Sequence, residues 1–304
     1  MPSYRARWTR FLLRHYLGRK YRKAGRSVSE LRSLDDVIVR NQRPPKGTRV
    51  ESVSVSGLSG EWIQGPGAGP DGAILHLHGG AFITGSPATH RELAARISAS
   101  AGVRVLSLDY RLAPEHPFPA AVEDALLAYR WLLDRGYTPS SLFLGGESSG
   151  GGLALQTLLS MKNDGVPMPR AAFFLSPVTD WTELDGASFT TRAELDPLIS
   201  LSQCRFTASL YVGENPGDNP LLRPTEMDLE GLPPMWIQVG DHEVLLSDSE
   251  RLAQRAKDAG VDVEFKVWPG LWHVFQGAAR FVPEGQNSIE ELGRYLRNRL
   301  PETR

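Results

Sequence analysis

Short apolar runs recur along the chain and alternate with segments of helical periodicity. The interior runs are continuously apolar, which is typical of strands covered on both faces. Between them, apolar residues return every three or four positions, as on one face of a helix. We expect strands at Val50–Val55, Glu61–Gln64, Ala73–Leu77, Val103–Leu108, Ser141–Leu144, Ala171–Leu175, Met235–Val239 and Val263–Trp268. We expect helices at Pro87–Ala101, Pro119–Asp134, Ser149–Lys162, Leu246–Ala259 and Asn287–Arg299.

This alternation predicts an α/β fold, with a mainly parallel sheet and helices on both of its faces. Two stretches break the rhythm, at residues 1–46 and at about 181–225. Because ligand sites in open α/β sheets lie at the carboxyl edge of the strands, we expect both stretches to form a helical cap over that edge. The predicted organisation is N-terminal cap helices over residues 1–46 and a catalytic domain over residues 47–304, with a cap insertion at about 181–225.

Composition narrows the function classes. The 304 residues suffice for one large domain, and 41% hydrophobic with 23% charged residues is typical of a globular protein. A net charge of −1 creates no field that would recruit nucleic acid. No apolar run approaches the roughly 20 residues that span a bilayer. The single cysteine, Cys204, excludes an internal disulfide.

The N-terminus is unusually basic. Residues 1–29 contain nine Arg or Lys and no acidic residue, and aromatic and leucine residues recur from Tyr4 to Tyr21 at roughly helical spacing. Such a helix can lie on an anionic lipid surface. The simpler interpretation, which we adopt as the expectation, is a cap helix with a solvated basic face. No export signal is legible, so the expected location is cytoplasmic.

The strongest chemical signal is the G-x-S-x-G motif centred on Ser148. It follows an expected strand and opens an expected helix, which is the setting of a nucleophile elbow. The glycines allow a tight strand-to-helix turn, and the helix N-terminus favours a developing negative charge. Upstream, His78-Gly79-Gly80 follows the strand Ala73–Leu77. Amides of Gly79, Gly80 and Ser149 are therefore candidate oxyanion donors, with His78 shaping the loop.

The general base is expected late in the chain, in the order serine, acid, histidine. His273 follows the last expected strand, and none of the other six histidines does. The acid is ambiguous, because the strand Met235–Val239 is followed by both Asp241 and Glu243. Strand-end position alone does not choose between them.

Together these motifs resemble the hormone-sensitive-lipase family of α/β-hydrolases, in particular its microbial esterases. The matching stretches are HGG at 78–80, DYRLAPEHPFPAA at 109–121, GESSGG at 146–151, SPVTD at 176–180, LPP at 232–234 and the His273 region. The resemblance implies an eight-stranded, mostly parallel sheet, a helical cap and hydrolysis of short- to medium-chain esters without a cofactor or metal. It also implies a possible homodimer through the last strand and helix.

The family's register bears on the acid. Its carboxylate usually lies about thirty positions before the histidine and about sixteen before an Ala-Gly-Val-like turn, and both counts give Glu243 here. The family more often has aspartate there, so Asp241 is retained as the alternative. Two further departures are Ala81 in place of a third glycine and Ser149 in place of an alanine; neither removes a Gly79 or Gly80 amide.

The predicted activity is that of a serine carboxylesterase forming an acyl-enzyme on Ser148. A lactonase, amidase or acyltransferase would use the same residues, so these activities remain alternatives. A non-catalytic small-molecule receptor is another alternative, against which the complete set of serine, acid and histidine argues. The aromatic residues nearest the expected site are candidates for the substrate pocket: Phe82, Trp181, Trp272 and Phe275.

Overall fold

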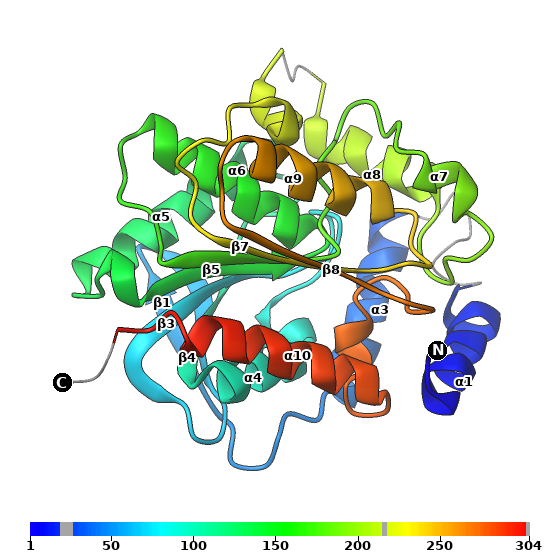
Figure 1. Ribbon diagram of the computed structural model, residues 1–304, viewed down its shortest axis with the longest axis horizontal. Coiled ribbons are helices and arrows are strands. Elements are labelled where there is room, and N and C mark those ends of the chain that lie inside the picture. Colours follow the sequence, from blue (N-terminus) through cyan, green and yellow to red (C-terminus); the bar gives the residue numbers. More distant parts are fainter. Residues whose placement is uncertain (19–26, 215–217, 302–304) are drawn as a thin grey trace.

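The computed structural model describes residues 1–18, 27–214 and 218–301 (Figure 1). Its centre is an eight-stranded sheet in the order β1-β2-β4-β3-β5-β6-β7-β8. All eight expected strands are present, most of them one to four residues longer than expected. Their bounds are β1 Arg49–Val55, β2 Leu58–Gln64, β3 Gly69–Leu77, β4 Val103–Asp109, β5 Leu142–Glu147, β6 Ala171–Leu175, β7 Met235–Gly240 and β8 Val263–Trp268.

The sheet is mostly parallel, as expected. Strand β2 pairs antiparallel with β1 and β4, and the strands from β4 to β8 pair in parallel. In the register of β3 and β5, Leu77 lies opposite Gly146. Parallel pairing therefore brings the loop after β3, which begins at His78, beside the turn that contains Ser148. Two motifs about 70 residues apart in the sequence meet at one edge of the sheet.

Helices cover both faces of the sheet (Figure 1). Helices α5 (Ala120–Asp134), α6 (Ser149–Asn163) and α9 (Leu246–Asp258) pack on one face, and α4 (Pro87–Ala101) and α10 (Pro283–Arg297) on the other. Each face has its own apolar core, because successive side chains of a strand point to opposite sides. Leu75 and Leu144 pack in the first core, and Ile74 and Phe143 in the second.

The start of the last helix differs from the expectation. It begins at Pro283 instead of Asn287. Proline suits the first helical turn, because its missing N–H would have no partner there and its φ is already helical. Apolar periodicity alone did not mark this start, since the first turn is Pro-Glu-Gly-Gln.

Both segments expected to form a cap contain helices. The first holds α1 (Tyr4–Leu12), the π-helical turn η1 (Leu13–Leu17) and α3 (Val28–Asn41). The second holds α7 (Ser188–Thr191) and α8 (Leu201–Val212). In Figure 1 α1, α3, α7 and α8 lie toward the right-hand side of the molecule. Short 3-10 turns complete the fold: η2 Pro139–Ser141, η3 Pro220–Leu222, η4 Pro224–Glu226 and η5 Phe275–Ala278.

Helix α3 is fixed to the body by charged contacts. Arg32 donates to both carboxylate oxygens of Glu115 at 2.7 Å and to the carbonyl oxygen of Ile83 at 2.8 Å. Asp35 accepts from the amide of Gly85 at 3.0 Å. The N-terminal segment is thereby attached to the loop that follows β3. Among the described residues, no helix is both long and apolar enough to cross a membrane.

Candidate active site

Ser148 occupies a sharp turn between β5 and α6. Its φ of 56° and ψ of −124° are unusual for a residue with a side chain, and the turn leaves the side chain partly exposed. The flanking glycines have a steric reason. A Cβ atom at Gly146 or Gly150 would lie 2.1 Å or 2.0 Å from the carbonyl oxygen of Leu77. The turn can pack this closely against β3 only because both positions lack a side chain.

The serine, histidine and one glutamate form a continuous hydrogen-bonded chain. Nε2 of His273 lies 2.9 Å from Oγ of Ser148, and Nδ1 of His273 lies 2.9 Å from Oε2 of Glu243. His273 and Glu243 are buried. The serine comes from the end of β5, the acid from the segment after β7 and the histidine from the segment after β8. Parallel strands end at one edge, so three distant segments converge there.

Glu243 is held by two further donors. Its Oε1 atom accepts from the amide of Gly240 at 2.6 Å and from the hydroxyl of Ser176 at 2.8 Å. Burial acts to lower the pKa of His273, but the hydrogen bond and charge of Glu243, together with the charges of Asp196 and Glu147, outweigh it and raise that pKa above 6.5. The imidazole is therefore poised to accept a proton while its other nitrogen stays fixed.

Asp241, the alternative acid, lies in a different environment. Its Oδ1 atom accepts from the amide of Gly270 and lies 3.7 Å from Nε2 of His242. Its side chain is about one-third exposed, whereas Glu243 is fully buried. The geometry thus brings Glu243, and not Asp241, to the ring of His273.

The loop after β3 requires a correction of the expected oxyanion donors. The amide of Gly79 donates to Oε1 of Glu147 at 2.7 Å, so it is not free to bind a substrate oxygen. Within the described residues, the amides of Gly80 and Ala81 form no hydrogen bond. Both residues have positive φ, 123° for Gly80 and 55° for Ala81. The sequence motif located the loop but did not show which of its amides turns toward the buried carboxylate.

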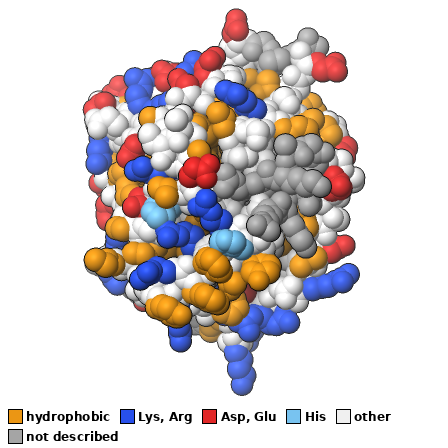
Figure 2. All heavy atoms as spheres, turned by 90° about the vertical axis from the view of Figure 1, so that its right-hand side faces the viewer, with side chains coloured by type: hydrophobic (Ala, Val, Ile, Leu, Met, Phe, Trp, Pro, Cys, Tyr) orange, Lys and Arg blue, Asp and Glu red, His pale blue; other side chains and the backbone are white. Residues whose placement is uncertain are grey.

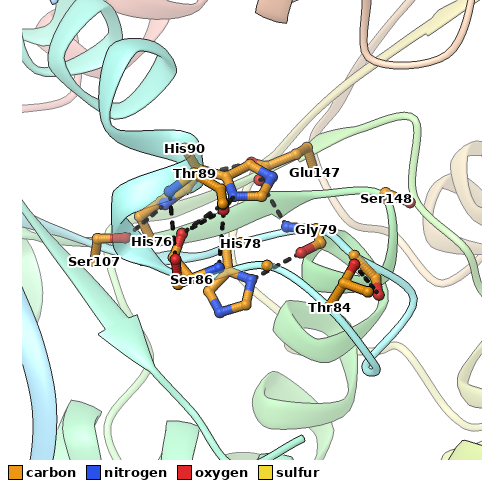
Figure 3. A network of polar contacts seen from close by, with 12 residues as sticks. His76, His78, Gly79, Thr84, Ser86, Thr89, His90, Ser107, Glu147 and Ser148 are labelled. Atoms are coloured by element: carbon orange, nitrogen blue, oxygen red, sulfur yellow. Dashed lines mark hydrogen bonds and ion pairs between the residues drawn. The ribbon is translucent and has the colours of Figure 1, made fainter. Parts of the chain in front are cut away.

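Glu147 is the centre of a buried polar network beneath this loop (Figure 3). Its Oε2 atom lies 2.7 Å from Nε2 of His76, and its Oε1 atom lies 3.4 Å from Nε2 of His90. Figure 3 shows its side chain directed toward these histidines and away from Ser148. Burial acts to raise the pKa of Glu147, but the two histidines and the Gly79 amide outweigh it and lower the pKa to about 2. The carboxylate is therefore charged at neutral pH.

His78 has the structural surroundings expected of it. Its ring is buried between the rings of Tyr110 and His90, with centroid separations of 4.2 Å and 5.4 Å. Nδ1 lies 2.8 Å from the carbonyl oxygen of Gly79, which accepts the ring proton. Burial lowers the pKa of His78 to about 3, so the ring is neutral. It supports the loop from below.

Comparison with known proteins agrees with this architecture. Residues 74–277 match the family described as having the α/β hydrolase fold. An acetyl-hydrolase of Streptomyces hygroscopicus is 42% identical over 247 residues, which are 81% of each chain. A crystal structure of an esterase from the bacterial hormone-sensitive lipase family is 40% identical, covers 99% of this chain and 100% of that one, and has a TM-score of 0.93.

The chain belongs to the hormone-sensitive-lipase family of α/β-hydrolases. A second structural relative is the esterase EstE5, whose crystal was soaked with p-nitrophenyl butyrate. EstE5 is 38% identical, and the match covers 98% of this chain and 99% of the EstE5 chain, with a TM-score of 0.91. Like these relatives, the protein is an ester hydrolase.

A mainly apolar cavity of about 570 Å³ lies beside the histidine of this esterase. It separates the N-terminal helix from the segment that carries His273. Its lining includes Leu13 and Tyr16 on one side, Leu198 from the cap segment, and Trp272, Val274 and Phe281 on the other. An acyl or alcohol group placed here would contact mainly apolar side chains.

The four aromatic residues expected near the site are all buried, Phe82 and Trp181 in one apolar cluster and Trp272 and Phe275 in another. Trp272 lines the cavity beside His273. Phe82 stacks on Tyr211 with a centroid separation of 3.6 Å and packs against Trp181 at 4.9 Å. Phe275 packs against Trp268. Of the four, Trp272 alone lines this cavity.

Sequence reasoning missed two residues that support the site, Ser176 and Glu147. Ser176 has a φ of 51°, donates to Glu243, and accepts from the amide of Val274 at 3.3 Å. Both residues stood in motifs already recognised, one at the end of β6 and the other just before the nucleophile. Their positions carried a signal, but only the packing shows which groups they bind. No cluster of His, Cys, Asp or Glu in the described ranges has the form of a metal site.

Proposed function

We propose that Ser148 is the nucleophile of a two-step acyl transfer from carboxylic esters to water. Nε2 of His273 takes the hydroxyl proton as Oγ attacks the ester carbonyl carbon. The tetrahedral intermediate then expels the alkoxide, which receives that proton from His273. Water, deprotonated by the same nitrogen, attacks the acyl-enzyme and releases the acid and free Ser148. The observation that carries this proposal is the chain of two 2.9 Å contacts from Ser148 through His273 to Glu243.

Glu243 is the proposed acid of this triad. A carboxylate at Nδ1 fixes the tautomer in which Nε2 is free to accept a proton, and it stabilises the imidazolium formed during attack. The two donors to its other oxygen, Gly240 and Ser176, hold the carboxylate in place. These two donors therefore hold the side chain of glutamate, which is longer than that of aspartate, in the conformation that reaches His273.

The proposed oxyanion donors are the amides of Gly80, Ala81 and Ser149. Ser149 is the first residue of α6, where main-chain amides have no partner within the helix. Gly79 contacts the nucleophile closely, since a Cβ atom on it would lie 3.3 Å from Cβ of Ser148. This contact supports placing the next two amides of the loop near the reacting carbonyl. Such preorganised donors contribute a few kcal/mol to the transition state.

The proposed substrates are esters with short- to medium-chain acyl groups. The cavity of about 570 Å³ beside His273 has the size and apolar lining that suit such a group. Trp272 is the proposed pocket residue with direct support, and Phe82, Trp181 and Phe275 are proposed to hold the surrounding walls. Lactones and small amides pass through the same tetrahedral chemistry, so a comparison of p-nitrophenyl esters, lactones and anilides will rank these activities.

The decisive experiment combines labelling and turnover. A fluorophosphonate should label the intact protein, and p-nitrophenyl acetate should be hydrolysed. Ser148→Ala should abolish both, with a loss of roughly 10⁶-fold in kcat, as for a removed serine nucleophile. Labelling that persists in Ser148→Ala, or absence of turnover by the intact protein, would contradict the proposal.

Three further features are proposed together with the activity: the domain organisation, the location and the oligomeric state. Residues 1–46 and about 181–225 form the cap over a catalytic domain of residues 47–304, and the enzyme acts in the cytoplasm. Strand β8 ends the sheet and pairs only with β7 among the described strands, which supports a homodimer formed through β8 and α10. Analytical ultracentrifugation tests the dimer, since a monomer at all concentrations would exclude it.

A further inference from the structure

The aromatic side of helix α1 is exposed to solvent. Of its residues only Ala6 is buried. Three aromatic side chains of α1, which we call the aromatic ridge, are largely exposed: Tyr4 at 78%, Trp8 at 52% and Phe11 at 47%. They are spaced four and three residues apart, so they share one face of the helix. Trp8 and Phe11 stack on each other at 5.6 Å.

Arginines flank the aromatic ridge on one side. Arg7, Arg10 and Arg14 line a groove of about 390 Å³. The side chains of the aromatic ridge line the same groove, together with Leu195 and His242 of the body. Glu194 pairs with Arg14 at 3.3 Å, and Asp241 attracts Arg10. With Arg5, the helical segment carries four arginines and no acid, so positive charge prevails along it. In Figure 2, which views the molecule from the side where α1 lies, apolar and basic side chains are interspersed on the lower part of the face.

The other side of α1 faces the active site. Leu12, Leu13 and Tyr16 form one wall of the apolar cavity beside His273. Phe281, which is 59% exposed, stands on the opposite rim, with Arg280 over its ring at 5.1 Å. Helix α1 and the turn η1 that continues it therefore place a basic groove, with the aromatic ridge along it, next to the cavity where the acyl group is proposed to bind.

We propose that the α1 face is a docking surface for an anionic phospholipid bilayer, from which ester substrates enter the cavity beside His273. The aromatic ridge inserts at the level of the headgroups, where aromatic side chains are most favourable. Arg7 of the basic groove binds a lipid phosphate, and the neighbouring arginines add positive charge to the surface. A substrate acyl chain leaves the apolar layer without crossing water. This surface extends the proposed esterase function, on which the entry of substrate depends.

The attachment of α1 suits this role. Ser3 caps the helix and donates through its hydroxyl to Glu284 at 2.9 Å, and Arg10 donates to the carbonyl oxygen of Gly270 at 3.3 Å. These contacts fix the side of α1 that faces the body. They leave the aromatic ridge free of the contacts that would cover it in a packed core.

The test is co-sedimentation of the full chain with vesicles. We expect binding to vesicles of phosphatidylcholine mixed with phosphatidylglycerol, weaker binding to phosphatidylcholine alone, and release at high salt. The double variant Trp8→Gln and Phe11→Gln should bind at least about tenfold more weakly. Arg7→Gln should bind the mixed vesicles about fivefold more weakly, as expected for one cation near an anionic surface.

A matched control is Phe206→Gln on α8, because Phe206 is also a partly exposed aromatic residue but lies outside α1. It should bind as the wild type does. Hydrolysis of dissolved p-nitrophenyl acetate should be unchanged in the double variant, since neither Trp8 nor Phe11 lines the cavity beside His273. Hydrolysis of a long-chain ester embedded in mixed vesicles should fall with the loss of binding.

Wild-type protein that stays in the supernatant while it hydrolyses the dissolved ester overturns the docking surface and leaves the esterase function intact. The same holds if the double variant sediments like the wild type. A wild-type dimer that the double variant cannot form, without vesicle binding, assigns the aromatic ridge to a second copy and also overturns the proposal. If the wild type does not hydrolyse the dissolved ester, the proposed function is contradicted. Vesicle sedimentation does not depend on that result, so the two failures are distinguishable.

Discussion

Two buried glutamates support the site around Ser148, and each contacts a histidine. Glu243 holds His273, whose far nitrogen reaches Oγ of Ser148 at 2.9 Å. Glu147 contacts His76 and His90, and neither ring contacts the nucleophile. The same pair of residue types therefore serves two purposes. Beside Ser148, the glutamate makes His273 a proton acceptor. Beneath the loop after β3, the glutamate binds the amide of Gly79.

The partners explain the difference. Glu243 faces a single imidazole and uses its other oxygen for Gly240 and Ser176. Glu147 faces two imidazoles and the Gly79 amide, which stabilise its charge at a fully buried position. A buried carboxylate without such partners would become protonated instead. The functional difference therefore depends on the partner of the histidine's second ring nitrogen, which for His273 is Oγ of Ser148.

The largest expected effect is the loss of activity when the carboxylate of Glu243 is removed. Glu243→Ala should lower kcat by about 10⁴-fold, because His273 loses the group that fixes its tautomer and stabilises its cation. Steady-state hydrolysis of p-nitrophenyl acetate measures this. Asp241→Ala is the matched control, and its kcat should change little because Asp241 binds the Gly270 amide. A collapse in Asp241→Ala alone would transfer the acid role to Asp241.

The next effect concerns the loop. Glu147→Ala should lower kcat by about 10²-fold with little change in KM, because a loop free to shift misplaces the oxyanion donors. Glu147→Gln keeps an oxygen that accepts from the Gly79 amide, so it should recover most of this loss. Rates are compared below the unfolding temperature of each variant. If Glu147→Gln were as slow as Glu147→Ala, the charge rather than the hydrogen bond would matter.

The pH profile distinguishes the pairs more finely. His273 must be neutral to accept the Ser148 proton, and its pKa is raised above 6.5, so kcat/KM should fall as the pH drops through that raised pKa. Glu243→Gln removes the main raising influence, which should move this acidic limb to lower pH. Glu147 also raises the pKa of His273, by its charge and without a hydrogen bond, and as a smaller cause than Glu243. Glu147→Gln should therefore move the limb in the same direction by less.

The smallest effect is on stability in acid. The pKa of Glu147 falls from 4.5 to about 2 on folding, so its charged form stabilises the native state above pH 4.5. This contribution should be lost as the pH falls from about 4.5 to about 2. Urea unfolding of the wild type and Glu147→Gln should show a difference in unfolding free energy that shrinks over this interval. A difference that stays constant would mean that the carboxylate does not titrate there.

Much of the fold was predictable because apolar periodicity reports burial directly. All eight strands and the helices between them followed from it, and the start of α10 was wrong where a proline, rather than an apolar residue, begins the helix. The candidate site was less predictable. Gly79 and Gly80 look alike in the sequence, yet one amide binds Glu147 and the other binds nothing in the described part of the chain.

The N-terminal helix shows a similar limit. Basic and aromatic residues at helical spacing predicted a helix, and α1 is present. Whether its aromatic side packs inward depends on the surface it meets, which the local pattern does not contain. The structure turns Ala6 inward and leaves Trp8 and Phe11 exposed.

By itself, the sequence determined the order of strands and helices, the serine at a strand-to-helix turn and a late histidine, because these features depend on local pattern and short spacing. The tertiary structure decided which carboxylate reaches His273, which amides stay free near Ser148 and which side of α1 meets solvent. The first two depend on the ends of strands that are neighbours only after the sheet forms, and the third depends on the surface against which α1 packs. Parallel pairing brings residues 79, 148, 243 and 273 to one edge, and the direction of each side chain there follows from its neighbours across the sheet.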